Sequence, residues 1–477
     1  MNDIYLEQDA TGLADLVRRR EFSAAELVES AITRIELLNP TLNAVVHSFY
    51  PRGRERAGQA LDGPFAGVPM LLKDLCGELA GEPTRCGSRI IPPVPSPHNS
   101  ELVDRFLAAG LIPLGKTNTP EFGLVGTTEP ALYGPAKNPW NTAHSTAGSS
   151  GGSACAVASG MVPIAHANDG GGSIRMPASA CGLVGLKPTR ARNPLGPQLG
   201  DIMAGLVQEH VVCRSVRDAA RMLDCTHGPG IGDPYAAPVP PESFAAALNA
   251  KGRRLKIGFA RTKPDGSALH PDCVAAAETA ARLCEGLGHM VEEASPAINN
   301  ELLLPSFLAL WTSGLVMQID HICSLTGQVP SLDNLEGLTF GLYQAGQQVS
   351  GAQVLGAVAT FQATGRQVGH WHQTYDVWLT PVLGSPPIPN GVIDFGNTNV
   401  GEAFAPMTDY VPFTPIQNGT GQPAIALPLH WNDAGLPVGV QIVGAVGQEA
   451  MLIALAAELE MAQPWEPRCL AMRRALA

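Results

Sequence analysis

Serine and lysine side chains in glycine-rich or apolar surroundings are the residues of this sequence best placed to do chemistry. Two serine clusters are flanked by glycine: Ser149 with Ser150, and Ser173 after three glycines. Ser149 and Ser173 are 24 residues apart. Far upstream, Lys73 follows an apolar run. We interpret Lys73, Ser149 and Ser173 as a catalytic relay.

The glycines before Ser173 suit the stabilisation of an oxyanion. Without a Cβ, successive backbone N–H groups can converge on one point. Gly170, Gly171 and Gly172, with the backbone of Ser173, are therefore predicted to surround a carbonyl oxygen while Ser173 Oγ attacks its carbon. A flexible loop is the alternative reading, but the turn lies between two apolar segments, which favours the catalytic one.

A serine nucleophile needs a base. None of the 12 histidines stands in a triad context, and His370 and His372 lack a carboxylate at ligand spacing, so we expect no metal. A lysine can serve if burial lowers its pKa from about 10.4. Lys73 suits such burial, although the local pattern also fits a surface lysine at a strand end.

Two short motifs match other catalytic patterns. The segment from Gly110 to Thr117 fits the phosphate-loop pattern, but a helix precedes it and its inner residues are apolar, so we expect no nucleotide there. Residues 148–152 fit the GxSxG elbow with Ser150 as nucleophile. That elbow requires a buried strand directly before it, whereas the preceding residues are polar.

The bulk composition indicates a globular protein that does not bind nucleic acid. The chain has 477 residues, 45% hydrophobic and 16% charged, with a net charge of −12. Binding to phosphates would require a basic face. We see no secretory signal and no apolar run that could span a membrane. Ten cysteines without a CxxC pair indicate reduced thiols, so we expect a cytoplasmic protein.

Hydrophobic periodicity and turn residues predict alternating helices and strands. The predicted helices cover 23–39, 52–61, 101–109, 153–160, 215–223, 271–286, much of 300–372 and 449–461. The predicted strands end at Lys73 or cover 111–115, 162–167, 255–260, 289–292, 377–380, 424–429 and 438–443. This order predicts an α/β fold, one large domain around a mixed sheet. Within residues 1–477 we expect an N-terminal helical layer (1–62), a catalytic core (63–255), a βαβ unit with a helical cover (256–375), and C-terminal strands and a helix (376–477).

Six segments in order resemble the amidase signature family and cover nearly the whole chain. They read GVPMLLKD, KTNTPEFG, GSSGGS, DGGGSIRMPA, CGLVGLKPT and GQPAIALPLHWNDAGLPVGVQIVG. The resemblance implies a mixed twisted sheet covered by helices on both faces. It also implies a cofactor-free hydrolase that cleaves amide C–N bonds through an acyl-enzyme. The implied roles are nucleophile for Ser173, cis-serine for Ser149, base for Lys73, oxyanion hole for Gly170, Gly171 and Gly172, and support for Asp169, Arg175 and Ser150.

Two details separate the chain from many family members. It reads NDGGGSIR, with Asn168 and Gly170, where many read TDTGGSIR, and Ala147 replaces a glycine. The first variant is similar to the branch that contains the 6-aminohexanoate cyclic-dimer hydrolases, which act on nylon oligomers, and enzymes that cleave anilides or urethanes. Leu124 stands where that branch is expected to have a polar residue, which favours a more apolar substrate.

The expected partner is a small amide or carbamate. We expect its pocket to be lined by Gly123, Leu124, Val125, Ile174 and Ile416. The second hypothesis is a component like the A subunit of the tRNA-dependent amidotransferase, a glutaminase that acts with partner subunits. A scaffold without activity is a third. A homodimer would be an ordinary assembly for such a fold.

Overall fold

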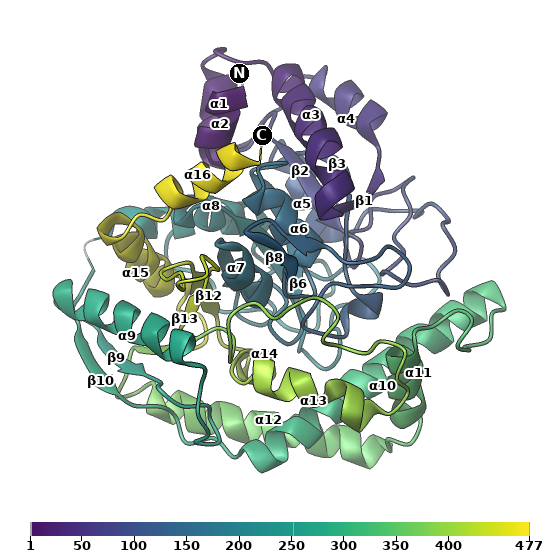
Figure 1. The fold of residues 1–477 in the computed structure, drawn as a ribbon, viewed down its shortest axis with the longest axis vertical. Coiled ribbons are helices and arrows are strands. Elements are labelled where there is room, and N and C mark those ends of the chain that lie inside the picture. Colours follow the sequence, from purple (N-terminus) through teal and green to yellow (C-terminus); the bar gives the residue numbers. More distant parts are fainter. Residues whose placement is uncertain (1, 251, 477) are drawn as a thin grey trace.

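Short apolar strands alternate with helices to give a layered α/β architecture. The computed structural model describes residues 2–250 and 252–476. Helices surround one large sheet, to which both the early and the late parts of the chain contribute strands (Figure 1). The strands that form its middle are buried along their whole length, because helices cover both faces there.

The sheet has eleven strands within the described residues and is mixed, as predicted. From one edge to the other they are β1 (Val45–Ser48), β3 (Ile112–Thr117), β2 (Pro69–Lys73), β6 (Ile164–Asp169), β8 (Gln208–Cys213), β7 (Val184–Lys187), β12 (Ala424–Leu427), β13 (Val440–Val443), β11 (Val377–Pro381), β9 (Lys256–Phe259) and β10 (Met290–Glu293). The β3–β2–β6 and β11–β9–β10 groups are parallel, and the other neighbours are antiparallel. A small hairpin pairs β4 (Lys137–Asn138) with β5 (Asn141–Ser145).

The helices begin largely where the sequence predicts them. Ser23 forms a capping box with Glu26 at the start of α3, and Ser215 caps α8 by accepting from the backbone N–H of Asp218. The α-helices are α1 (Asn2–Glu7), α2 (Ala10–Arg18), α3 (Ala24–Leu42), α4 (Tyr50–Ala57), α5 (Glu101–Ala108), α6 (Gly151–Ala158), α7 (Arg175–Cys181), α8 (Val216–Thr226), α9 (Pro271–Gly286), α10 (Asn300–Thr326), α11 (Gly337–Gly346), α12 (Gly351–Trp371), α13 (Val400–Tyr410), α14 (Thr414–Thr420), α15 (Glu449–Ala462) and α16 (Glu466–Ala475). Two 3₁₀ helices, η1 (Glu121–Gly123) and η2 (Phe244–Asn249), complete the set.

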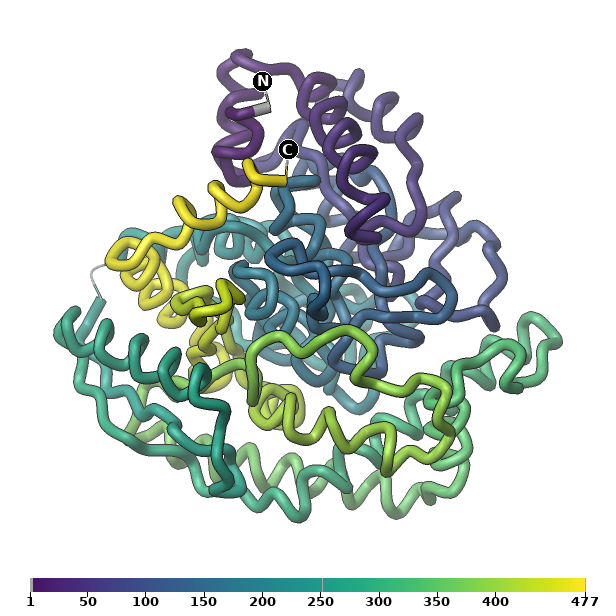
Figure 2. Tube along the Cα trace, viewed as in Figure 1, coloured from purple at the N-terminus to yellow at the C-terminus, as the bar shows by residue number. Residues whose placement is uncertain are grey.

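The two ends of the chain lie together. Helices α1 and α16 are side by side, and Arg474 of α16 pairs with Glu7 of α1 at 2.5 Å (Figure 2). At the opposite end of the view, α10, α12 and α13 form a helical layer below the sheet (Figure 1). Among the described helices, α10 is long and apolar enough to cross a membrane. This is weak evidence for a membrane span, because core helices of soluble proteins meet the same criteria of length and composition.

The parallel strands β3, β2 and β6 place polar residues at one edge of the sheet. Parallel strands end on the same side. Lys73 closes β2, and Asn168 and Asp169 close β6, so these side chains meet at that edge. The phosphate-loop reading of the segment up to Thr117 does not hold. Residues 112–117 are strand β3, and the fully buried Lys116 donates to the carbonyl of Gly77.

Candidate active site

Lys73, which the sequence predicts to be the base, is buried. Its side chain is 0% exposed, and its Nζ lies 2.7 Å from Ser149 Oγ and 2.5 Å from Asn168 Oδ1. Burial lowers the pKa of Lys73 to about 7, although negative charge on Cys76, Glu209 and Asp169 would act in the opposite direction. The amine is therefore substantially neutral near physiological pH and can accept a proton.

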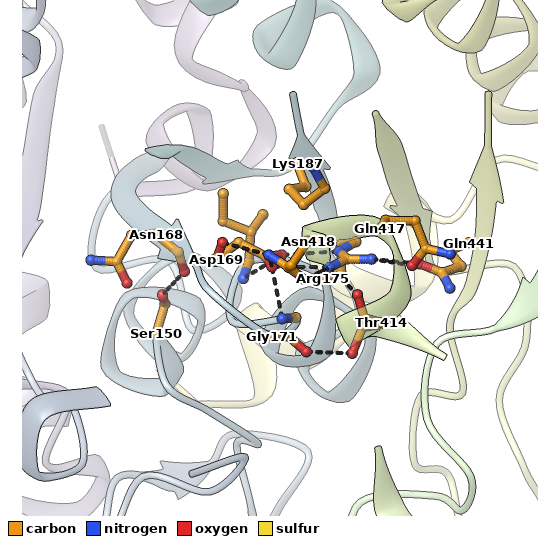
Figure 3. Close-up of polar contacts among 12 residues, drawn as sticks. Ser150, Asn168, Asp169, Gly171, Arg175, Lys187, Thr414, Gln417, Asn418 and Gln441 are labelled. Carbon is orange, nitrogen blue, oxygen red and sulfur yellow. Dashed lines mark hydrogen bonds and ion pairs between the residues drawn. The ribbon is translucent and has the colours of Figure 1, made fainter. Parts of the chain in front are cut away.

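Ser149 and Ser150 stand directly before α6 and serve different partners. The peptide bond between Gly148 and Ser149 is cis. The Ser149 hydroxyl faces Lys73, whereas Ser150 Oγ donates to the carbonyl of Asn168 at 3.2 Å (Figure 3). Ser150 thus ties α6 to the end of β6 and does not face the lysine.

Ser173 lies just before α7 in the wall of a cavity. It is 4% exposed, and within residues 2–250 and 252–476 its hydroxyl has no hydrogen-bond partner. It therefore makes no hydrogen bond to Ser149 in this structure. Gly123 lines the same cavity, and a Cβ added to it would be 3.1 Å from Ser149 Oγ. Gly123 therefore lies between the cavity and Ser149.

The glycine loop before Ser173 offers fewer free donors than predicted. The Gly172 N–H donates to Asp169 Oδ1 at 2.7 Å and so is not available to an oxyanion. The Gly171 carbonyl accepts from Thr414 Oγ1 at 2.7 Å. In the described part of the chain, the N–H groups of Gly170, Gly171 and Ser173 have no protein acceptor. These three N–H groups are the remaining candidates for an oxyanion hole, because the carboxylate that braces the loop uses the fourth.

An ion pair of Arg175 with Asp169 fixes this loop. Both side chains are fully buried, and Arg175 Nε lies 3.0 Å from Asp169 Oδ2. Although burial disfavours its charge, Arg175 and then Lys187 lower the pKa of Asp169 to about 2. Figure 3 shows the remaining acceptors around the guanidinium, which come from α14 and β13: the Thr414 carbonyl, Gln417, Asn418 and Gln441. The arginine thereby joins the glycine loop to the last third of the chain.

The cavity next to Ser173 has a volume of about 410 Å³ and a largely apolar wall. Phe307 and Trp311 of α10 stack with their ring centroids 5.0 Å apart, and their edges face the glycine loop. At the rim, Lys263 pairs with Asp409 at 2.6 Å. The apolar lining residues are Leu124, Val125, Met176, Pro264, Leu303, Leu304, Phe307, Trp311, Phe361, Phe404, Met407, Val411, Pro412, Pro415 and Ile416.

Of the five residues expected to line the pocket, Gly123, Leu124, Val125 and Ile416 do so. Ile174 does not. It is fully buried, and both its carbonyl and its Cγ2 lie against Gly185 of β7, because the chain turns toward the sheet as α7 begins. The sequence does not single out the aromatic residues of α10, since helical periodicity does not say which face of a helix meets the site.

Asn168 is the polar neighbour of Lys73 that the sequence reading left without a role. The sequence marks it as a departure from the common family motif and gives no sign of its contact with the lysine. Within residues 2–250 and 252–476, no group of three or more His, Cys, Asp or Glu side chains could hold a metal ion.

Comparison with known proteins decides the family. The family model described as Amidase matches residues 26–453, which is most of the chain. The chain belongs to the amidase family. This amidase is 37% identical to a 6-aminohexanoate-cyclic-dimer hydrolase of Pseudomonas sp. (strain NK87), over 98% of its own length and 97% of that protein.

Solved structures agree with this assignment. The amidase superposes on a 6-aminohexanoate cyclic dimer hydrolase complexed with substrate with a TM-score of 0.93 and 37% identity, covering 97% of this chain and 98% of that one. A bacterial aryl acylamidase of the amidase signature family gives a TM-score of 0.87 at 27% identity, with 98% of each chain covered. The predicted α/β fold and the prediction of an amidase are thus confirmed.

Proposed function

We propose that this amidase hydrolyses small apolar amides, anilides or carbamates through an acyl-enzyme on Ser173, with Ser149 and Lys73 as the proton relay. The observation that carries the proposal is the 2.7 Å contact between Ser149 Oγ and the fully buried Lys73 amine. A depressed pKa near 7 lets that amine act as a base at neutral pH.

In the acylation step, Ser173 Oγ bonds to the substrate carbonyl carbon and passes its proton to Ser149. Ser149 passes its own proton to Lys73. The oxyanion is held by free N–H groups of the glycine loop, with Gly171 in the cavity wall. The C–N bond then breaks, and the relay returns the proton to the leaving amine.

In the second half, water attacks the acyl carbon while the relay takes one of its protons. The bond between that carbon and Ser173 Oγ then breaks, the relay returns the proton to Ser173 Oγ, and the acid leaves. The mechanism requires the Ser173 hydroxyl to turn onto Ser149 when substrate binds, since no group in the described part of the chain forms a hydrogen bond with it. The apolar wall of the cavity supports a substrate with little charge.

A fluorophosphonate probe followed by peptide mapping tests the nucleophile. We expect the label on Ser173 and no label in Ser173→Ala. The unlabelled parent protein should hydrolyse apolar acyl anilides. A label on Ser150 would support the GxSxG elbow instead. Absence of label on folded protein, together with glutaminase activity that appears only with added partner subunits, would support the amidotransferase alternative.

A cytoplasmic location and a homodimer are also proposed. All ten cysteines are free thiols, which is consistent with a reducing compartment.

A further inference from the structure

The amine of Lys73 has a second partner besides Ser149. Asn168 Oδ1 lies 2.5 Å from Lys73 Nζ, and Asn168 itself is only 3% exposed. Asn168 and His166 are two apart in β6, so both point to one face of the strand. His166 Nδ1 accepts the backbone N–H of Lys73 at 3.3 Å. The end of β6 therefore contacts both the backbone and the amine of the lysine.

The orientation of the Asn168 amide is fixed. Its Nδ2 donates to the carbonyl of Leu75 at 3.1 Å, and a carbonyl can only accept. Oδ1 is then the atom that faces Lys73. Since an amide oxygen cannot donate, Lys73 must use one of its own N–H bonds toward Asn168.

A neutral lysine amine has two N–H bonds and one lone pair. The two partners of Nζ are Asn168 Oδ1 and Ser149 Oγ. When one N–H is held by Asn168, rotation about the terminal C–N bond is restricted, and the lone pair can face the Ser149 hydroxyl. Without that acceptor, an N–H of the amine could point at Ser149 Oγ, and the serine could not give up its proton.

We propose that Asn168 is a positioning residue that holds the Lys73 amine so that its lone pair faces Ser149. This inference rests on the proposed role of Lys73 as the base. Because the Asn168 amide is uncharged, it accepts from both the neutral and the protonated amine without favouring the ammonium as strongly as a carboxylate would.

The lack of charge on Asn168 matters because several acidic groups already surround the lysine. The titratable groups near it are Cys76 after β2, Cys86 in the following loop, Asp169 of β6 and Glu209 of β8, while His166 meets its backbone. A carboxylate in place of the amide would add negative charge at hydrogen-bond distance. The ammonium would then be stabilised and would lose its proton only at higher pH.

The test compares Asn168→Asp, Asn168→Ala and Asn168→Thr with the parent. The readout is the rate of fluorophosphonate labelling of Ser173 between pH 5.5 and 10, alongside hydrolysis of an apolar anilide. For Asn168→Asp we expect the rising limb to move to higher pH by at least one unit, with activity returning at alkaline pH. In Asn168→Ala, the rate of labelling should be at least tenfold lower than in the parent at every pH. The rate in Asn168→Thr, which keeps an acceptor oxygen, should lie between those of Asn168→Ala and the parent.

Asn193→Ala is the matched control. Asn193 is also buried and also donates to a backbone carbonyl, that of Glu209 at 2.7 Å, but it does not contact Lys73. It should lower the melting temperature without moving the pH profile. An Asn168→Asp profile that superimposes on the parent, or an equal shift in Asn193→Ala, would overturn the inference.

A further variant separates this inference from the proposed function. If Lys73→Met leaves labelling unchanged, the lysine is not the base, and both ideas fail. If Lys73→Met abolishes labelling while the folded Asn168 variants behave like the parent, only the role of Asn168 is refuted. Thermal unfolding of each variant identifies those that are folded. Asn168→Thr keeps a polar oxygen at this position, so it can still be tested if Asn168→Ala is unstable.

Discussion

Lys73 Nζ and Ser149 Oγ lie 2.7 Å apart, both side chains are buried, and burial lowers the pKa of the lysine to about 7. Only the unprotonated amine can accept a proton from the serine. The neutral fraction rises from roughly a tenth at pH 6 to roughly nine tenths at pH 8.

We therefore expect kcat/KM for an amide substrate to rise about tenfold between pH 6 and pH 8 and then to level off, as measured by steady-state kinetics. In Lys73→Met, kcat/KM should be lower by about three orders of magnitude or more and should show no such rise with pH. A rate that falls across this range while circular dichroism reports an intact fold would contradict a lysine base.

The Asp169–Arg175 pair should contribute strongly to the stability of the folded protein. Arg175→Met would leave the Asp169 carboxylate buried without its cation, at a cost of about 3–5 kcal/mol in the free energy of unfolding. The double variant Asp169→Asn, Arg175→Met should lose less unfolding free energy than the two single variants lose in sum, as measured by urea unfolding. Strict additivity would mean that the two charges are not coupled.

Stability should fall as the pH rises through the range in which Glu336 ionises. Burial and the neighbouring Glu121 carboxyl raise the pKa of Glu336 to about 8, against an ordinary value of 4.5. The folded protein thus binds more protons than the unfolded chain between pH 4.5 and 8, so this stabilisation is present at low pH and is lost as pH rises to 8. Asp218 and Glu460 act in the same direction.

Glu336→Gln keeps an oxygen for the Ala131 N–H, which Glu336 Oε1 accepts at 2.6 Å. We expect the melting temperature of this variant to depend less on pH between 5 and 8 than that of the parent. Equal slopes for the two proteins would show that Glu336 ionises normally.

Leu124 tests the apolar character of the cavity. It is 4% exposed and lines the cavity beside Gly123. Leu124→Asn would place an amide in this wall, and kcat/KM for an apolar anilide should fall roughly 5- to 30-fold, which corresponds to about 1–2 kcal/mol. Leu124→Met, which keeps the wall apolar, should change it little. An unchanged value in Leu124→Asn would place the substrate elsewhere.

The sequence supports the coarse architecture because apolar runs and capping residues are local signals. The strand that ends at Lys73, the Ser23 and Ser215 caps and the βαβ unit of β9, α9 and β10 follow from such signals. Strands β7 and β8 were not expected, because their short segments carry too little alternation. The order of strands in the sheet depends on contacts between distant residues and could not be derived.

At the site, the resemblance to a family suggested Lys73, Ser149 and Ser173, and local patterns alone did not distinguish Lys73 from a surface lysine. The sequence marks Asn168 as a variant position but does not reveal its role, because its contact with Lys73 joins residues 95 apart in the chain. The engagement of the Gly172 N–H could not be predicted either, since the sequence does not say from which N–H groups the Asp169 carboxylate accepts hydrogen bonds.

The acceptors that hold Arg175 include side chains from Gln417, Asn418 and Gln441, which follow it by 242 to 266 residues. On a ribosome, the glycine loop and Ser173 therefore emerge long before these acceptors. Asp169 can pair with Arg175 as soon as the loop has been made, whereas the acceptors from α14 and β13 exist only after those elements have been synthesised. The glycine loop is thus braced in two stages, first by a neighbour in the sequence and later by residues more than 240 positions further along the chain.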